Sequence, residues 1–341
     1  MTVALGEYLD AVPDLVAERI VGARQALIVS HENPDADTLG AALGVARIIE
    51  YHGGRATTVC TDPVPPLYDF LPGIEAERTE LDPATTYDLL VVVDCGTFDR
   101  VGEIGRRHAE LFERMPRVII DHHLSNSGSS TPAADWVDAG SAATCEMVVL
   151  LAARLGVPLD VADGGMAAAL MAGIIMDTST FAHSNVTPRT LQVAAALVEA
   201  GAPLADISRR LYRTKPDGQL RLFGRVLGRL QVADGGRVVW SSLLDSDLAA
   251  TGTSPADSEG IIDLVAQAED AEVAIIFKEV AGATRISVRT RPDGVDATVL
   301  TGAFGGGGHA RAAGATIQQP LDAARTAVLA EARRLAAAVA R

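Results

Sequence analysis

Lysine is almost absent from this sequence, and aromatic residues are scarce. The only lysines among the 341 residues are Lys215 and Lys278, aromatic residues make up 4%, and the net charge is -15. Affinity for long nucleic acid comes largely from phosphate neutralisation by Lys and Arg, and sequence-tolerant binding of single strands needs aromatic stacking. The composition therefore argues against a protein that binds long nucleic acid.

Cysteine and long apolar runs are also rare. Cys60, Cys95 and Cys145 are odd in number, far apart and form no CxxC motif, so they predict neither a disulfide framework nor a zinc knuckle. The first residues lack the basic and apolar regions of a secretory signal. The longest apolar run, at 166–176, is too short to span a bilayer. We therefore expect a cytoplasmic protein with no membrane partner.

The residues that are present suffice for two folded domains. Apolar residues make up 48% of the chain and charged residues 21%, which excludes a disordered protein. Residues 1–200 contain 12 Arg and 28 acidic residues, whereas residues 201–341 contain 17 basic and 16 acidic residues. This asymmetry indicates a first half that holds cations and a second half that meets an anion.

Short runs rich in Val and Ile alternate with helical stretches in the first half of the chain. This alternation is typical of an α/β fold with a doubly wound, mainly parallel sheet. The expected strands are residues 25–30, 55–60, 87–94 and 117–121, and the expected helices are 37–53, 102–114, 141–156, 166–176 and 188–201.

The second half predicts a smaller α/β domain. We expect a first domain over residues 1–205, a helical linker over 206–232 and a second domain over 233–341. The linker belongs to a long helix from about 203 to 232 whose repeated arginines are expected on a solvated face. The elements expected in the second domain are strands at 236–244, 271–280 and 284–290, helices near 257–268 and 321–340, and a glycine run within 304–309.

Acidic and imidazole side chains follow the expected strands at their carboxyl ends. Open parallel sheets bind ligands at this edge. The run HENPDAD follows the first strand, other Asp and His residues end the third and fourth strands, and one Asp ends the helix at 166–176. The residues expected to gather there are His31, Asp35, Asp37, Asp94, Asp121, His122, His123 and Asp177.

Each of these residues alone has an ordinary explanation. Asp37 could cap the helix that follows it, and a His-His pair is commonly solvated. Together, however, the carboxylates would repel one another unless cations neutralised them. Mixed Asp and His ligands without a thiolate suit Mn²⁺ better than calcium or structural zinc. The combination predicts two bound divalent ions, most suitably Mn²⁺.

Four motifs resemble those of the DHH phosphoesterase superfamily: HENPDAD, VVVDCG, DHH and GIIMDT. ISVRT followed by FGGGGHARAAG is similar to the DHH-associated C-terminal domain. Their order and spacing over roughly residues 15–320 resemble the two-domain NrnA-type nano-RNases, which act on short oligoribonucleotides and pAp, and in some cases on linear or cyclic di-AMP. The resemblance implies a catalytic, metal-binding first domain and a substrate-binding second domain.

The resemblance also implies a role for each residue of the cluster. The first metal would be held by His31 and Asp35, the second by Asp37, His122 and Asp177, with Asp94 bridging both. His123 would face the substrate phosphate, as a catalytic residue beside Asp94, and either stabilise charge or protonate the leaving oxygen. Asp121 would orient the adjacent imidazoles. Asn33 and Pro34 would shape the turn that brings Asp35 and Asp37 to the edge of the sheet.

In the second domain, the resemblance implies contacts to the nucleotide. Gly305 to Gly308 lack β-carbons, so an anion can approach their backbone N–H groups closely. The expected contacts come from Arg289, Gly307, Gly308 and His309. Weaker candidates are Arg291, Arg311 and, in the first domain, Arg100, for which a surface ion pair is an equal alternative.

One position departs from the family pattern. The fourth motif often continues as DTG, whereas this chain has a serine at 179. This leaves the contacts of Thr180 and His183 open.

The expected activity is hydrolysis of short oligoribonucleotides to 5′-mononucleotides and of pAp to AMP, with linear or cyclic di-AMP as a further substrate. Two ions would lower the pKa of a water and spread the charge on the phosphoryl oxygens. A homodimer is also expected from the resemblance. A family II inorganic pyrophosphatase, a RecJ-like exonuclease and a non-catalytic cyclic-dinucleotide receptor are the alternatives. A pyrophosphatase would need a Lys/Arg cluster in its second domain, and a RecJ-like exonuclease would need a basic channel. A non-catalytic receptor would be expected to have lost some of the metal ligands.

Overall fold

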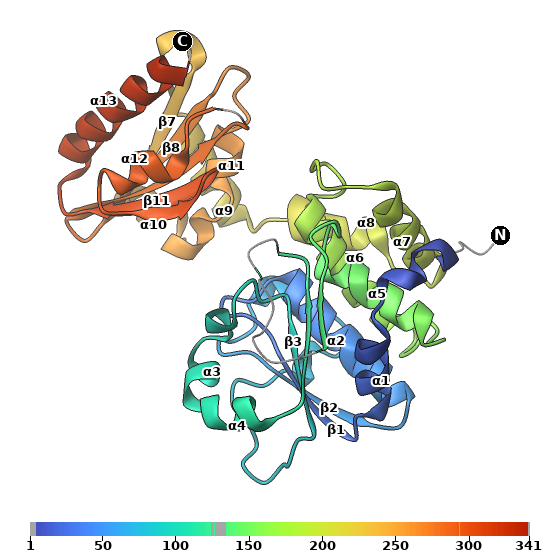
Figure 1. The fold of residues 1–341 in the computed structure, drawn as a ribbon. Helices are drawn as coiled ribbons and strands as arrows, with labels where there is room; N and C mark the ends of the chain where they lie inside the picture. Colours follow the sequence, from blue (N-terminus) through green and yellow to red (C-terminus); the bar gives the residue numbers. More distant parts are fainter. Residues whose placement is uncertain (1–4, 124–125, 127–133, 293, 340–341) are drawn as a thin grey trace. The chain divides into compact units, whose positions relative to one another are not determined.

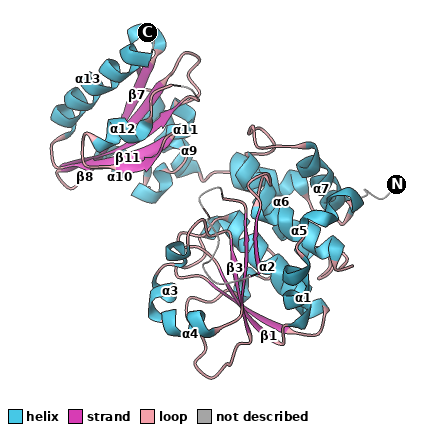
Figure 2. Cartoon of the chain, viewed as in Figure 1, coloured by secondary structure: helices cyan, strands magenta, loops and turns pink. Residues whose placement is uncertain are grey.

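The computed structural model describes residues 5–123, 126, 134–292 and 294–339. It contains two compact units, Met1–Thr214 and Lys215–Arg341, each with its own hydrophobic cores and each with helices packed on a sheet (Figures 1 and 2). The predicted α/β class with a parallel sheet in the first domain is confirmed.

The first unit is built on a five-stranded parallel sheet with strand order β2-β1-β3-β4-β5. Its strands are β1 (Gln25–Val29), β2 (Arg55–Val59), β3 (Leu89–Val93), β4 (Arg117–Asp121) and β5 (Ala134–Val137). β1, β3 and β4 are almost entirely buried, as their continuous apolar runs predict. The sequence analysis missed β5, whose four residues lie at the sheet edge and are alternately buried and half-buried.

Helices cover both faces of this sheet, which makes it doubly wound. α2 and α5 pack on one face with α6 against both, while α3 and α4 lie on the other face (Figure 1). The predicted helix at 102–114 is divided at His108. The helices of this unit are α1 (Asp14–Gly22), α2 (Ala36–Tyr51), α3 (Glu103–Arg107), α4 (Ala109–Arg114), α5 (Thr144–Arg154), α6 (Gly165–Thr178), α7 (Pro188–Glu199) and α8 (Leu204–Ser208), with short turns η1 (Gly6–Ala11), η2 (Pro66–Tyr68), η3 (Ile74–Ala76), η4 (Phe98–Val101) and η5 (Arg209–Arg213).

The second unit has a six-stranded mixed sheet with strand order β10-β11-β9-β8-β7-β6. Only β7 and β8 are parallel. Its strands are β6 (Gln231–Ala233), β7 (Val238–Leu243), β8 (Val273–Val280), β9 (Ala283–Thr290), β10 (Gly307–His309) and β11 (Ala312–Ile317). α12 and α13 pack on one face, and α9 and α11 on the other. The helices are α9 (Asp217–Leu227), α10 (Asp245–Thr251), α11 (Ile261–Val265), α12 (Ala297–Gly302) and α13 (Leu321–Val339), with short turns η6 (Asp234–Gly236) and η7 (Pro255–Ser258).

The expected continuous helix from 203 to 232 is not observed. α8 and η5 end at Arg213, and α9 begins after Pro216. Proline disfavours a helical conformation at the residue before it and lacks the N–H that a continuing helix needs. α9 then buries Leu222 and Val226 in a core of the second unit, so it is part of that unit.

Among the described residues, no single helix has the length and apolar composition needed to cross a membrane. One bent pair of helices, Pro188–Glu199 with Leu204–Arg213, is long and apolar enough for a membrane span by length and composition alone. Its residues Val193 and Leu197 are fully buried in the first unit.

Candidate metal centre and active site

The predicted cluster lies where the strand order of the first sheet reverses. β1 is followed in the chain by β2 on one side, and β3 then pairs with β1 on its other side. His31, Asp94 and His122 follow β1, β3 and β4, so three adjacent strands deliver their side chains to one edge. Loops diverge at such a reversal and leave room for a ligand.

Seven side chains form three overlapping groups of three at this edge, and Asp94, His122 and His123 make up one of them. Of the other two, the first group is His31, Asp35 and Asp94, and the second is Asp37, His122 and Asp177. In each group, one ligand atom per residue lies within 4.8 Å of the others. These two groups contain the residues for which the sequence analysis predicted metal binding, and their role as ligands stays a prediction; α2 and α6 supply the residues that do not follow a strand.

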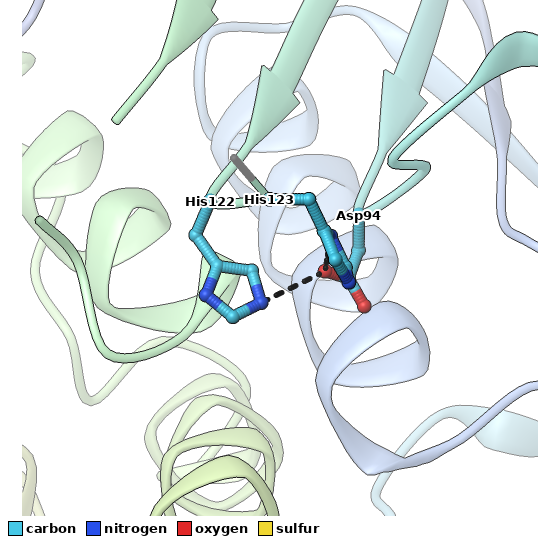
Figure 3. Close-up of side chains that lie close together, drawn as sticks. All are labelled: Asp94, His122 and His123. Atoms are coloured by element: carbon cyan, nitrogen blue, oxygen red, sulfur yellow. Dashed lines mark ion pairs between the residues drawn. The ribbon is translucent and has the colours of Figure 1, made fainter. Parts of the chain in front are cut away.

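Asp94 connects the two groups through its two carboxylate oxygens. Oδ2 lies 3.5 Å from Nε2 of His31, and Oδ1 lies 3.5 Å from Nε2 of His122. Figure 3 shows His122 and His123, which follow β4, beside Asp94. Asp94 has a left-handed backbone with φ 57°, and the hydroxyl of Thr144 donates to its Oδ1 at 2.8 Å.

Asp35 and Asp37 are separated by one residue but have different anchors. Oδ1 of Asp35 accepts the backbone N–H groups of Asp37 and Thr38 and thereby caps α2, while Oδ2 lies 3.8 Å from His31. Asp37 is fully buried and accepts the N–H groups of Thr144 and Cys145 at the start of α5. The alternative that Asp37 caps α2 is therefore wrong, because Asp35 occupies the cap.

Two histidines present Nε2 to the carboxylates because Nδ1 is hydrogen-bonded elsewhere. Nδ1 of His31 lies 2.8 Å from the carbonyl of Glu32, and Nδ1 of His122 lies 3.3 Å from the carbonyl of Ser141. An Nδ1–H that donates to a carbonyl leaves Nε2 as the ring atom with a free lone pair. Both imidazoles are therefore oriented as metal ligands.

His123 is oriented differently. Its Nδ1 lies 2.7 Å from Oδ1 of Asp121, whose other oxygen accepts the side-chain amide of Asn126 at 2.7 Å. Asp121 is fully buried, but His123 is one-third exposed. Asp121 thus orients one imidazole of the pair through its Nδ1.

The carboxylates of the cluster are electrostatically unfavourable without a cation. Burial, and then the charge of Asp177, raise the pKa of Asp37 to about 7. Burial, followed by the charges of Asp37 and Asp35, raises the pKa of Asp94 well above its ordinary value. Burial alone would lower the pKa of His122, but the surrounding carboxylates raise it to about 10. In the absence of a cation, these raised pKa values mean that the carboxylates and His122 hold protons more strongly, which reduces the repulsion between the carboxylates.

The residues present fit bound divalent metal. Nε2 of His122 is buried and has no hydrogen-bond partner of normal geometry among the described residues, although Oδ2 of Asp177 lies 3.1 Å away. An orphaned imidazole nitrogen among carboxylate oxygens is the donor set of a borderline metal. The thiols of Cys60 and Cys145 donate to backbone carbonyls, and burial raises the pKa of each thiol, so they are not competing ligands.

Two of the substrate-binding residues predicted in the second unit, Arg289 and His309, share one face of its sheet. Arg289 on β9 pairs with Ala312 on β11, and Ala312 pairs with His309 on β10. Directly paired residues point to the same face of a sheet, so Arg289 and His309 lie in one row. Nε of Arg289 also donates to Asp263 at 2.9 Å, which an incoming anion must share or displace.

The glycine run forms a strand and not only a turn. Gly307 and Gly308 belong to β10, which pairs antiparallel with β11. The run was expected as a backbone surface for an anion, and the sequence analysis did not predict the β10–β11 pair.

The weaker candidates have local partners. The side chains of Arg291 and Arg311 donate to backbone carbonyls within the second unit. The carbonyl of Arg100 accepts the N–H of Glu32 beside the cluster. Nδ1 of His183 lies 3.1 Å from the carbonyl of Asp177.

Ser179 and Thr180 follow α6 in left-handed conformations with φ 47° and 59°. A glycine, as in the family's DTG, would adopt this conformation without strain. Thr180 places its hydroxyl 3.3 Å from that of Ser208.

Sequence reasoning missed the residues that hold the ligands. Thr144, Ser141 and Asn126 contact Asp94, His122 and Asp121 respectively. None forms a recognisable pattern with its partner, because the partners lie up to 50 residues apart. The proximity of Asn126 to the DHH motif was the only local signal.

Comparison with known proteins identifies the families of both units. The profile of the DHH family, N-terminal domain, matches residues 25–174, and that of the DHHA1 domain matches residues 236–338. The chain is 32% identical to the bifunctional oligoribonuclease and PAP phosphatase NrnA of Thermus thermophilus, over 85% of this chain and 83% of that protein. It is 25% identical to the protein of the same name from Bacillus subtilis, over 84% and 87%.

A solved structure shares the fold over the full length of both chains. The exopolyphosphatase-related protein from Bacteroides fragilis superimposes with a TM-score of 0.84 at 22% identity, and the match covers 100% of each chain. The resemblance drawn from the four motifs and the C-terminal glycine run is thereby confirmed at the level of sequence families. The chain belongs to the DHH family of phosphoester hydrolases and carries the DHHA1 domain.

Proposed function

We propose that this protein is a divalent-metal-dependent phosphoesterase that hydrolyses short oligoribonucleotides to 5′-mononucleotides and pAp to AMP. The observation that carries the proposal is the pair of ligand groups joined by the two oxygens of Asp94. Relatives named bifunctional oligoribonuclease and PAP phosphatase support the substrate class. Linear and cyclic di-AMP are further substrates to test, because each contains two joined nucleotides.

In this proposal His31 and Asp35 hold one cation, Asp37, His122 and Asp177 hold a second, and Asp94 is shared. Mn²⁺ is the best match to mixed carboxylate and imidazole ligands without a thiolate. Bound cations supply a water of lowered pKa and positive charge for the phosphoryl oxygens. The buried anchors of Asp37 and Asp94 support this assignment because they hold the carboxylates in place before any cation binds.

His123 is the proposed catalytic residue of the protein itself. Asp121 holds its Nδ1, so Nε2 is the ring nitrogen that can reach a substrate. An imidazole at this position stabilises charge on a phosphoryl oxygen or gives a proton to the leaving oxygen. Arg289, Gly307, Gly308 and His309 of the second unit are the proposed nucleotide contacts.

One assay separates this function from its alternatives. Purified protein with Mn²⁺ is offered pAp, a dinucleotide, cyclic di-AMP and pyrophosphate in parallel. Cleavage of pAp and the dinucleotide is expected. Cleavage of pyrophosphate alone would replace the proposal with a pyrophosphatase, and tight binding of cyclic di-AMP without any turnover would replace it with a receptor.

Asp94→Ala tests the shared ligand. Its turnover should fall by more than about 100-fold, since changes to residues that merely orient metal ligands already cost roughly 10–100-fold. Its bound Mn²⁺ should fall for both groups. Asp99→Ala is the matched control, because Asp99 is exposed and outside both ligand groups. Full turnover in Asp94→Ala would refute the two-ion arrangement.

We extend the proposal to a homodimer in the cytoplasm. Sedimentation of the purified chain tests this assembly and should show a dimer. A monomer at micromolar concentration would contradict it.

A further inference from the structure

The loop before α5 contacts several ligand residues of the cluster. The carbonyl of Ser141 accepts from Nδ1 of His122. The N–H of Thr144 donates to Asp37 at 2.7 Å, and its hydroxyl donates to Asp94. This segment, residues 138–146, therefore determines where the ligands of the second group lie.

Arg189 on α7 holds this segment from the opposite side. Its Nη2 donates to Oδ2 of Asp138 at 3.0 Å and to the hydroxyl of Ser141 at 2.8 Å. Its Nε donates to Oε1 of Glu146 at 2.6 Å. Glu146 is fully buried, and its second oxygen accepts the N–H of Ala142 at 3.2 Å. One guanidinium thus ties both ends and the middle of the segment together.

The position of Arg189 on its helix is otherwise unexplained. Thr187 caps α7 through a capping box with Thr190, so Arg189 lies in the first turn. Cations are disfavoured at a helix N-terminus because the macrodipole is positive there. The Arg189 side chain is also only 17% exposed. Its two carboxylate partners account for both features, because they compensate a buried charge that the helix alone would disfavour.

We propose that Arg189 is a positioning residue for the second ligand group. Through Ser141 and residues 138–146 it keeps Nε2 of His122 among Asp37, Asp94 and Asp177. None of the contacts of Arg189 among the described residues reaches a ligand side chain directly. This inference rests on the proposed metal-dependent function and concerns only one of its two ligand groups.

The test is a titration of the full chain with Mn²⁺. The electron paramagnetic resonance signal of free Mn²⁺ measures how much metal is bound at each step. In the unchanged protein we expect two sites. In Arg189→Gln, one site should keep its affinity and the other should weaken by at least about tenfold, as for other residues that orient metal ligands. Arg189→Lys should lie between the two, because lysine keeps the charge but loses the planar fork that makes three contacts.

Two further variants separate positioning from simple structural damage. Ser141→Ala removes the hydroxyl that Arg189 contacts but leaves the carbonyl that accepts from His122, and it should weaken the same site by a smaller factor. If Arg189→Gln does not fold, Ser141→Ala decides the matter. Arg154→Gln is the matched control, because it removes an arginine of the same unit that pairs with Asp14 outside the cluster.

The outcomes are distinct. Selective weakening of one site in Arg189→Gln or Ser141→Ala supports the inference, and so does recovery of turnover at excess Mn²⁺. Unchanged affinity at both sites in each variant, or equal weakening of both sites, overturns it. Absence of Mn²⁺ binding in the unchanged protein would instead refute the proposed function.

Discussion

Different structural constraints act on the four glycines at residues 305–308. A β-carbon on Gly306 would lie 2.2 Å from the carbonyl oxygen of Gly314, and one on Gly308 would lie 2.6 Å from that of Ala312. Gly305 has φ 74°. A β-carbon on Gly307, however, would meet nothing within 4 Å, and the backbone of this residue is not left-handed. The fold of the second unit therefore requires three of these glycines but does not require Gly307.

Gly307→Ala should consequently separate binding from folding. We expect a stability change within about 0.5 kcal/mol, typical of an unconstrained surface position. The KM for a dinucleotide should rise about tenfold, a loss of about 1.4 kcal/mol, because the methyl group blocks close approach to the backbone. Steady-state kinetics and thermal melts measure both. Gly306→Ala is the contrasting neighbour and should destabilise the second unit. An unchanged KM in Gly307→Ala would remove Gly307 from the proposed contacts.

Asp247 gives Arg225 of α9 and Arg229, which follows this helix, a structural function that the sequence analysis did not predict. Asp247 is fully buried, and Arg225 and Arg229 donate to it at distances of 2.8 Å or less. The N–H of Leu244 donates to the same carboxylate at 3.1 Å. Burial alone would raise the pKa of Asp247, but these donors outweigh it and lower that pKa below its ordinary value. The two arginines are 45% and 35% exposed, so they lie on a solvated face, as expected, and also bind a buried carboxylate.

Asp247→Asn should destabilise the second unit by about 2–4 kcal/mol at pH 7, because two partly exposed arginines lose their buried partner. A carboxylate with a lowered pKa contributes stability above its unfolded pKa of about 4, and this contribution is lost as pH falls below that value. The difference between the unchanged protein and Asp247→Asn should therefore shrink between pH 5 and pH 2. Urea unfolding across this range measures it, and a constant difference would contradict the assignment.

At the scale of elements, the approach of α6 to α2 and α5 places Asp37. A β-carbon on Gly40 of α2 would lie 2.5 Å from the carbonyl oxygen of Ala169 on α6. One on Gly173 of α6 would lie 2.4 Å from Sγ of Cys145 and 2.6 Å from Oδ1 of Asp37. Only residues without side chains permit backbones this close, so these glycines bring Asp37 and Asp177 to the same site.

Gly173→Ala should affect both stability and metal binding. Overpacking of a close contact costs about 1–3 kcal/mol, and the displaced carboxylate is a proposed ligand. We expect a lower melting temperature without metal and weaker Mn²⁺ binding at the group that contains Asp37. Gly22→Ala, at the end of α1 with nothing within 4 Å of the added carbon, is the control. Wild-type Mn²⁺ affinity in Gly173→Ala would show that Asp37 is not constrained by this contact.

At the scale of the whole molecule, the chain consists of two units that do not share a core. The cores of the first unit and those of the second have no residue in common, and the boundary falls beside Pro216. The proposed metal ligands all belong to the first unit. Each unit contains one tryptophan, Trp136 in β5 and Trp240 in β7. Fluorescence can therefore follow the two units separately.

Mn²⁺ should stabilise only the first unit. Ligand at 100 times its dissociation constant adds about 2.7 kcal/mol to the state that binds it. In Trp240→Phe, the transition reported by Trp136 should shift to higher temperature with Mn²⁺. In Trp136→Phe, the transition reported by Trp240 should not move. Equal shifts in both variants would show that the units unfold as one.

Local pattern accounts for much of this protein. Apolar runs determine β1, β3 and β4, because strands buried on both faces need continuous apolar sequence. The Asp and His residues that end those runs, together with the parallel order, were enough to predict that these side chains gather at one edge of the sheet. The same local rules failed at β5 and β10, which are short edge strands without an apolar run. They also failed at Pro216, where the sequence pattern predicts one continuous helix but the structure has a break between two helices.

The sequence by itself therefore determined the family, the fold class and the residues that gather at the edge of the sheet. Only the tertiary structure decided that Asp35 caps α2 while Asp37 accepts N–H groups at the start of α5, that Thr144 and Ser141 contact residues of the cluster, and that Arg189 contacts Ser141. The physical reason is distance along the chain: Thr144 reaches Asp37 across 107 residues and Arg189 reaches Ser141 across 48. Hydrogen bonds of this kind depend on how helices pack, and no local spacing of residue types encodes them.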